Sequence, residues 1–270
     1  MSHKLIFSHR LFYGGKMTYF IDTNDARNQI LMSLLEERNQ ITEKFSFETL
    51  EKIGLGDALS FSPAKKWTDE EINLLPNKIS LYCGKISEKH QEIINNKEIA
   101  YHDLMNDEIF TTKNANITAE GVLALILEHS PKSIFENNVL IIGAGRIAKA
   151  MAIILGRLGV NYAVVRFNKD KFPECFSFSK TCYFGEQFLS HLHEYDVIIN
   201  TIPKMIFDEQ NFGKIARDTI YIETASTNSI DPALATHFEF VPAPALPQKY
   251  AKVTAAKYLL ENITGENNYV

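Results

Sequence analysis

An apolar segment, Val139–Ile142, leads directly into the hexapeptide Gly143-Ala144-Gly145-Arg146-Ile147-Ala148, and this junction constrains the fold most strongly. The hexapeptide matches the pattern G-x-G-x-x-A and opens a segment with helical apolar periodicity. In that setting Gly143 permits a tight turn, Gly145 lets a pyrophosphate approach the backbone, and Ala148 lets the helix pack closely on the strand. The pattern predicts a dinucleotide site at the positive end of a helix; a glycine-rich turn without a ligand is the alternative.

The rest of the chain alternates short apolar segments with helical ones, which indicates parallel sheets with connecting helices. We therefore predict an α/β fold of two Rossmann-like, doubly wound domains. The predicted strands lie at 19–21, 57–61, 79–84, 99–102, 139–142, 163–166, 196–200, 219–223 and 238–241. The predicted divisions are a leader over 1–16, an N-terminal α/β substrate domain over 17–117, a linking helix over 118–131, a nucleotide-binding domain over 132–247, and a C-terminal helix and tail over 248–270.

The leader, residues 1–16, differs from the rest of the chain and makes a poor signal peptide, because no small-residue cleavage site follows an apolar core. The first clear strand follows Met17. We expect Met17 to be the natural start and the leader to be disordered. An ordinary flexible N-terminal arm is the alternative.

The overall charge and the cysteines exclude several classes of protein. The net charge is -5 with a pI near 5.9, and no run of Lys or Arg offsets it, so nucleic acid is not an expected partner. No apolar stretch reaches the roughly 18 residues that a membrane span needs. The three cysteines, Cys83, Cys175 and Cys182, fit neither a disulfide framework nor a zinc site. We expect a cytoplasmic protein without a metal.

The segment after the second nucleotide-domain strand indicates which dinucleotide binds. An NAD site usually has Asp or Glu about 20 residues after the glycine motif, for the ribose 2′-hydroxyl. This chain has Arg166, Asn168 and Lys169 in that region, and the strand end carries no acid. Because cationic side chains favour a 2′-phosphate, the sequence predicts NADP(H). A solvated basic loop is the alternative.

Polar residues follow three more strands of the predicted nucleotide domain. In doubly wound folds ligands lie beyond the carboxyl ends of the strands, so we expect these residues to line one cleft. The cofactor-contacting residues that the sequence predicts are Gly143, Gly145, Arg146, Ile147, Arg166, Asn168, Lys169, Asn200, Thr201, Pro203, Thr224, Ala225 and Ser226. Of these, Asn200 and Thr201 are expected near the nicotinamide ribose.

Taken together, the segments resemble the family of the dipicolinate synthase A-subunit, over about Tyr19 to Ile263. The resemblance is carried by Asp25-Ala26-Arg27, Thr118-Ala119-Glu120-Gly121, Gly143-Ala144-Gly145-Arg146, Asn200-Thr201-Ile202-Pro203, Ala225-Ser226 and Leu246-Pro247. It implies two Rossmann-like domains with the substrate cleft between them and a C-terminal helix that returns toward the N-terminal domain. It also implies NADP-linked formation of dipicolinate from dihydrodipicolinate during sporulation, with a flavoprotein-like B subunit. A homo-oligomer, such as a dimer, is expected by analogy with such folds.

The chain departs from the family pattern at positions expected near the substrate. It has Thr227-Asn228-Ser229-Ile230 where the family usually has Lys-Pro-Gly-Gly, Gln248 where it has glycine, and Ile117 where it has proline. Losing glycines and a proline changes the freedom of the backbone there. The substrate therefore follows less firmly from the resemblance than the cofactor does.

Oxidation of a dihydropyridine dicarboxylate needs groups that hold carboxylates and a group that accepts a proton. Arg27 follows a strand end and is the candidate carboxylate clamp, unless it lies on a helix surface. Thr118 is expected to cap a helix whose free N–H groups can hold an anion, or to be only a cap. Glu120 and Lys249 are the proton-transfer candidates, although Glu120 also suits the first turn of a helix.

Two other functions remain open at this stage. One is a different small-acid NADP-dependent dehydrogenase, shikimate-like or acting on a hydroxyacid. The hydroxyacid version is disfavoured, because the corresponding strand ends carry no Arg, Glu and His set. The other is a non-catalytic NADPH-binding subunit that works with a flavoprotein partner.

Overall fold

A computed structural model describes residues 16–231 and 233–266, in two compact units. The first unit comprises the chain up to Asn114 and again from Pro247, and the second unit comprises Ala115–Leu246. All but Lys16 of the predicted leader lies outside the described residues. Within the described residues, no helix has both the length and the apolar character that crossing a bilayer requires.

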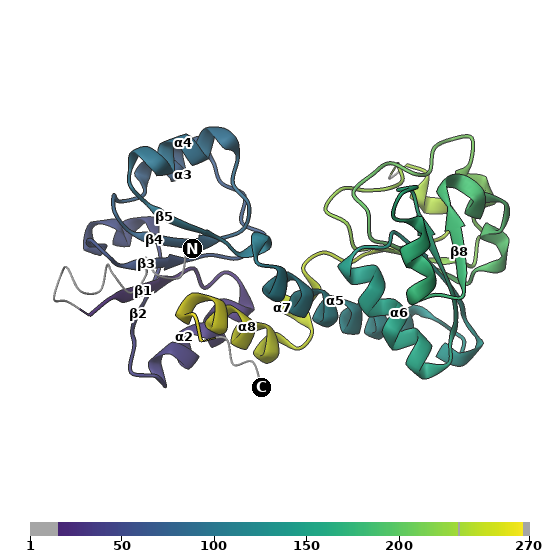
Figure 1. The fold of residues 1–270 in the computed structure, drawn as a ribbon, viewed down its shortest axis with the longest axis horizontal. Coiled ribbons are helices and arrows are strands. Elements are labelled where there is room, and N and C mark those ends of the chain that lie inside the picture. Colours follow the sequence, from purple (N-terminus) through teal and green to yellow (C-terminus); the bar gives the residue numbers. More distant parts are fainter. Residues whose placement is uncertain (1–15, 232, 267–270) are drawn as a thin grey trace. The chain divides into compact units, whose positions relative to one another are not determined.

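The first unit is a five-stranded parallel sheet with helices on both faces (Figure 1). In sheet order the strands are β2 (Ile41–Lys44), β1 (Thr18–Ile21), β3 (Ala58–Ser60), β4 (Ser80–Cys83) and β5 (Ala100–Asp103). One face packs against α2 (Ala26–Glu36) and α8 (Lys252–Thr264), and the other against α3 (Asp69–Leu74) and α4 (Glu88–Asn96). The expected return of the C-terminal helix to this unit is confirmed, because α2 and α8 lie side by side on the sheet.

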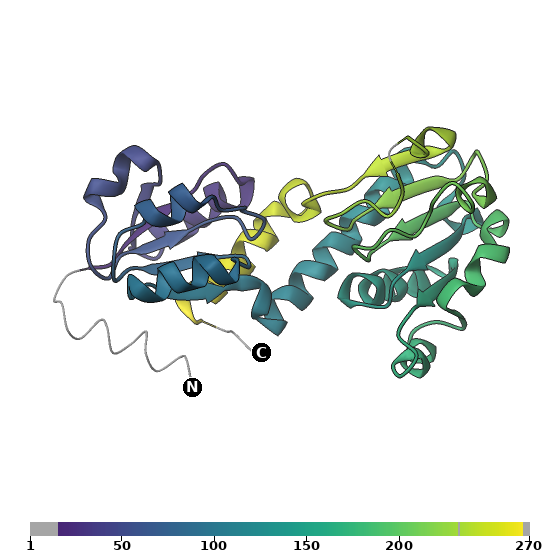
Figure 2. The same ribbon diagram turned by 90° about the horizontal axis from the view of Figure 1, so that it is seen from above.

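The second unit is a six-stranded parallel sheet, whose strands run side by side in Figure 2. In sheet order they are β11 (Glu239–Pro242), β10 (Ile220–Glu223), β9 (Val197–Asn200), β6 (Asn138–Ile142), β7 (Asn161–Arg166) and β8 (Thr181–Phe184). The chain changes direction across the sheet between β6 and β9, as in doubly wound nucleotide-binding sheets. The predicted α/β class with two parallel sheets is confirmed.

Helix α6 (Arg146–Leu158) follows β6 and packs its apolar side on the sheet. It ends at Gly159, whose φ of 75° gives the left-handed conformation that glycine adopts without steric cost. Buried strands on both sides of β6 make the centre of this sheet predominantly apolar, as is typical of a parallel sheet covered on both faces.

Helix α5 (Glu108–His129) is longer than predicted, and a helix start at Thr118 is wrong. The helix begins after Asp107, whose Oδ1 accepts hydrogen bonds from the backbone N–H groups of Ile109 (2.8 Å) and Phe110 (2.9 Å). Asp107 therefore supplies the cap. Thr118 lies in the helix interior, where backbone N–H groups are used by the helix itself, so it exposes no anion-binding turn.

The predicted C-terminal helix, expected from residue 248 onward, is divided in the structure. A short helix, α7 (Leu246–Lys249), is separated from α8 by Ala251, which has a left-handed φ of 50°. The positive φ interrupts the helical path, because a right-handed helix requires a negative φ at each residue. For alanine this conformation also has a steric cost, since its Cβ crowds the following carbonyl group.

Candidate functional site

The turn between β6 and α6 is built so that only glycine fits at its first position. Gly143 has a φ of +113°, and its backbone N–H donates to the carbonyl oxygen of Val165 at 3.0 Å. A Cβ added to Gly143 would lie 2.2 Å from Oγ1 of Thr201 and 2.9 Å from Cγ2 of Ile202. The loop after β9 therefore lies directly against the glycine turn.

The second glycine of the motif borders open space. Gly145 is the N-cap of α6 without a side-chain cap, and no heavy atom lies within 4 Å of the place a Cβ would occupy. Arg146 and Ile147 form the first turn of α6, where N–H groups have no partner within the helix. Ala148 is fully buried beneath the turn. An open, amide-lined helix start on a close-packed support fits a pyrophosphate.

The carboxyl end of β7 carries the predicted cations, together with an acid that the sequence analysis missed. Nη1 of Arg166 lies 3.2 Å from Oε2 of Glu174, which follows eight residues later in a short 3-10 helix. Asn168 accepts a hydrogen bond from the backbone N–H of Lys171 at 3.0 Å, and Lys169 is exposed. Arg166 is thus held in place at the strand end by a partner that is itself half exposed.

A further cation reaches this strand end from the loop after β9. Nζ of Lys204 lies over the ring of Phe167, 5.1 Å from its centre. Phe167 directly follows Arg166, so cations from two loops gather at the end of β7. Sequence spacing alone does not indicate Lys204, because its position depends on how β7 and β9 flank β6.

The end of β9 departs from the prediction at Asn200. Its side chain was expected near a ribose, but it is fully buried and donates to the carbonyl oxygen of Ile202 at 2.9 Å and to Oε1 of Glu223 at 2.7 Å. Thr201 does lie beside the glycine turn, and its Oγ1 donates to the carbonyl oxygen of Ile142 at 2.9 Å. Pro203 is exposed in the turn that follows.

The end of β10 is organised by Glu223, which the sequence analysis did not select. Its buried carboxylate accepts from the backbone N–H of Ala225 at 3.1 Å and from the backbone N–H of Ser229 at 2.9 Å. Thr224 is tied to β9, since its Oγ1 donates to the carbonyl oxygen of Asn200 at 2.6 Å. Ser226 is exposed. An acid that ends a wholly apolar strand was the available signal.

In the first unit, polar residues gather where the strand order reverses, between β1 and β3. Arg27 is buried, so the alternative of a surface position is wrong. Its Nε and Nη2 donate to the carboxylate of Asp25, the latter at 2.6 Å, and Nη1 lies 3.5 Å from Oδ1 of Asn114. Burial by itself would raise the pKa of Asp25, but the hydrogen bonds and the charge of Arg27 outweigh it and hold that pKa below its usual value.

The four predicted catalytic candidates are shared between the two units. Arg27 and Lys249 belong to the first unit, and Thr118 and Glu120 belong to the second. Glu120 is exposed in the interior of α5, so it is not a first-turn acid. Lys249 ends α7, with its Nζ 5.0 Å from the centre of the Tyr250 ring.

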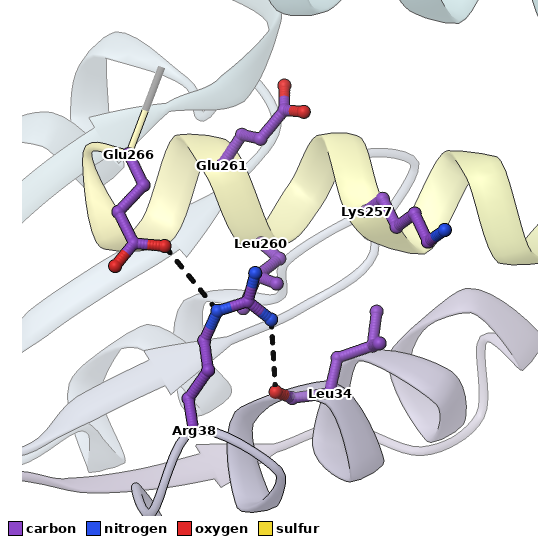
Figure 3. Close-up of a pocket in the computed structure, with 6 residues that line it drawn as sticks. All are labelled: Leu34, Arg38, Lys257, Leu260, Glu261 and Glu266. Carbon is purple, nitrogen blue, oxygen red and sulfur yellow. Dashed lines mark hydrogen bonds and ion pairs between the residues drawn. The ribbon is translucent and has the colours of Figure 1, made fainter. Parts of the chain in front are cut away.

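A surface pocket of about 250 Å³ lies between α2 and α8 (Figure 3). It is lined by Leu34, Arg38, Lys257, Leu260, Glu261 and Glu266. Arg38 is engaged there, with Nε 3.4 Å from Glu266 and Nη1 donating to the carbonyl oxygen of Leu34. None of the predicted site residues lines this pocket.

The parallel sheet, its strand order and the open glycine turn define a nucleotide-binding fold of the dehydrogenase type. No family model matches the chain. The A-subunit of dipicolinate synthase from Bacillus subtilis (strain 168) is 25% identical over 154 residues, which cover 54% of this chain and 50% of that protein. The matched segment thus spans half the length of the curated relative.

Solved structures extend the likeness to nearly the whole fold. The dipicolinate synthase A-subunit from Bacillus halodurans superposes with a TM-score of 0.78 at 19% identity, covering 94% of this chain and 99% of that one. Its Bacillus subtilis counterpart gives 0.78 at 18% identity, with coverages of 93% and 96%. A transhydrogenase from Sinorhizobium meliloti gives 0.69 at 10% identity, covering 92% of each chain. The chain thus shares its fold with the A-subunits of dipicolinate synthase, and over 154 residues it also resembles one of them in sequence.

Proposed function

We propose that the protein is an NADP-dependent oxidoreductase that converts dihydrodipicolinate, or a closely related cyclic dicarboxylate, to its aromatic product. The observation that carries the proposal is the open helix start at Gly145, flanked by the cations at the end of β7. The family likeness supplies the substrate class. A homo-oligomeric assembly and a flavoprotein-like B subunit are part of the same proposal.

The residues on each side of the glycine turn suit the two ends of NADP. The amides of Arg146 and Ile147 would hold the pyrophosphate, and Arg166 with Lys169 would hold the 2′-phosphate. Without the cofactor, Arg166 pairs with Glu174. With NADP bound, it would pair with the 2′-phosphate, so its guanidinium would have a partner in both states. When bound, the nicotinamide would supply the acceptor for a hydride.

The chain's own residues have two further tasks in this reaction, to bind a carboxylate and to accept a proton. Arg27 is already oriented by Asp25, and its Nη1 lies 3.5 Å from Oδ1 of Asn114, the outer limit of a hydrogen bond, so this edge of the guanidinium is suited to a substrate carboxylate. Lys249 or Glu120 would accept the proton released as the ring becomes aromatic. Thr118, buried in α5, would act as support.

Titration calorimetry with NADPH and NADH tests the cofactor, and the absorbance of NADPH formed from NADP⁺ and dihydrodipicolinate tests the reaction. We expect NADPH to bind at least about tenfold more tightly than NADH, because it adds a charge-assisted contact. The variant Arg166→Met should reduce this ratio, whereas Lys214→Met, in a different loop, should not. Equal affinities for the two nucleotides would contradict the NADP assignment.

The alternative of a non-catalytic NADPH-binding subunit predicts a different result in the same assay. Purified protein would then bind NADPH but produce none until a flavoprotein partner is added. Turnover by the isolated chain, lost in Arg27→Lys and in Lys249→Met or Glu120→Gln, would favour the enzyme.

A further inference from the structure

The carboxylate of Glu223 is the centre of a buried network at the end of β10. Glu223 is 4% exposed, and its carboxylate accepts four hydrogen bonds. The donors are Nδ2 of Asn200, the backbone N–H of Ala225, and both the backbone N–H and the hydroxyl of Ser229. All four donors are neutral, so the carboxylate is stabilised by hydrogen bonds and not by an ion pair with any of them.

Through these bonds Glu223 fixes two loops at once. On its own strand it holds the loop that contains Ala225 and Ser229. On β9 it holds Asn200, whose amide also donates to the carbonyl oxygen of Ile202 at 2.9 Å and accepts from the N–H of that residue at 3.3 Å. Glu223 and Asn200 are direct neighbours in the register of β10 and β9.

The contacts continue to the glycine turn. Thr201 and Ile202 are the residues that a Cβ on Gly143 would meet. Glu223 is therefore linked through Asn200 to the side chains that border the cofactor turn. In the sheet, β9 and β10 lie on the opposite side of β6 from β7, where the cations gather. This side suits the nicotinamide half of the cofactor, and the other suits the adenosine half.

Burying a carboxylate without a cation is costly, so its retention here needs the four donors. A glutamine could offer one acceptor oxygen, but its NH₂ group would face N–H donors in place of the second oxygen. We infer that Glu223 is a positioning residue that holds the loops after β9 and β10 in the conformation that admits the nicotinamide half of NADP(H). This inference rests on the proposed function.

The test compares Glu223→Gln with the wild type in calorimetric binding of two probes, NADPH and adenosine 2′,5′-bisphosphate, which lacks the nicotinamide half. If the variant leaves about a tenth of the molecules with competent loops, NADPH should bind about tenfold more weakly. The bisphosphate should bind within about twofold of the wild type, because its contacts lie on the β7 side. Ser229→Ala, which removes one of the four donors, should weaken NADPH binding by less and keep the inference testable if Glu223→Gln does not fold.

Tyr221→Phe is the matched control. Its hydroxyl contacts Ser229 Oγ but donates nothing to Glu223, so NADPH affinity should stay near the wild-type value even if the melting temperature falls. Equal weakening of both probes, or no weakening of either, would overturn the positioning role. If the wild type binds neither probe, the proposed function itself fails, and the inference fails with it.

Discussion

Replacing each glycine of the turn by alanine separates the two tasks that the turn performs. In Gly143→Ala, the new Cβ would lie 2.2 Å from Oγ1 of Thr201 on a backbone with φ of +113°. The left-handed conformation costs an alanine about 1–2 kcal/mol, and overpacking in a tight environment costs about 1–3 kcal/mol. We expect a loss of about 2–5 kcal/mol and a fall in Tm of roughly 10 °C.

Gly145→Ala should have little effect on the stability of the fold but should weaken the binding of NADPH. No heavy atom lies within 4 Å of its added Cβ, and the φ of -83° is ordinary for alanine. The loss of stability should be about 1 kcal/mol or less, the cost of alanine at an N-cap. The methyl group would nevertheless occupy the space in which a pyrophosphate approaches the helix start, and NADPH should bind at least about tenfold more weakly.

Thermal unfolding without nucleotide, followed by NADPH calorimetry below the melting temperature, distinguishes the two variants. We expect the Gly145→Ala protein to be stable but to bind NADPH poorly, and the Gly143→Ala protein to be unstable. Wild-type NADPH affinity in Gly145→Ala would refute the placement of the pyrophosphate at this turn. A wild-type Tm in Gly143→Ala would refute the steric argument.

Three further predictions concern the described fold. Asp107→Ala should lower the free energy of unfolding by about 1–2 kcal/mol in urea titrations, because it removes the cap of α5; an unchanged value would contradict the capping role. Asp25→Asn should cost about 3 kcal/mol at pH 7 by leaving Arg27 buried and unpaired. Since the folded pKa of Asp25 lies below the ordinary 3.8, its contribution is present above that pH and is lost as the pH falls below it; a difference between variant and wild type that grows on acidification would be contrary evidence. Burial, and to a lesser extent the neighbouring Cys175, raise the pKa of Cys182 to about 11, and burial raises the pKa of Cys83 to about 12. Thiol reagents at pH 8 should therefore react slowly with these cysteines until the protein unfolds. Rapid reaction of either thiol in the folded protein would disprove this.

Much of the fold was predictable because its signals are local. The segment Val139–Ile142 is apolar without interruption, and the glycine motif and α6 follow it directly. Neither the strand nor the turn needs a distant partner to be recognised. Strands β2 and β8, each at a sheet edge, were missed, and for β2 the reason is its polar composition, Ile41-Thr42-Glu43-Lys44, which an edge position tolerates.

The start of α5 depended on contacts that spacing does not show. Thr118 and the acid two residues later resemble a helix start, whereas the preceding residues include Thr and Asn, which are weak helix formers. In the fold, Asp107 caps the helix, and its Oδ2 also accepts from Nδ2 of Asn262 in α8 at 2.7 Å. A partner 155 residues away therefore helps to fix the position of the cap.

The same limit applies to polar residues at the strand ends, since the sequence places them at the correct edge but does not say which way they face. Asn200 and Thr201 are adjacent, yet one is buried in the Glu223 network and the other borders the glycine turn. Ser229 stands where the family usually has glycine, which on sequence grounds suggested a change in backbone freedom. In the structure its hydroxyl is buried between Tyr221 and Glu223, so this side chain anchors the loop after β10. If this loop borders the substrate, as proposed, we expect its exposed residues such as Asn228 to influence the choice of substrate, and not a loosened backbone at Ser229.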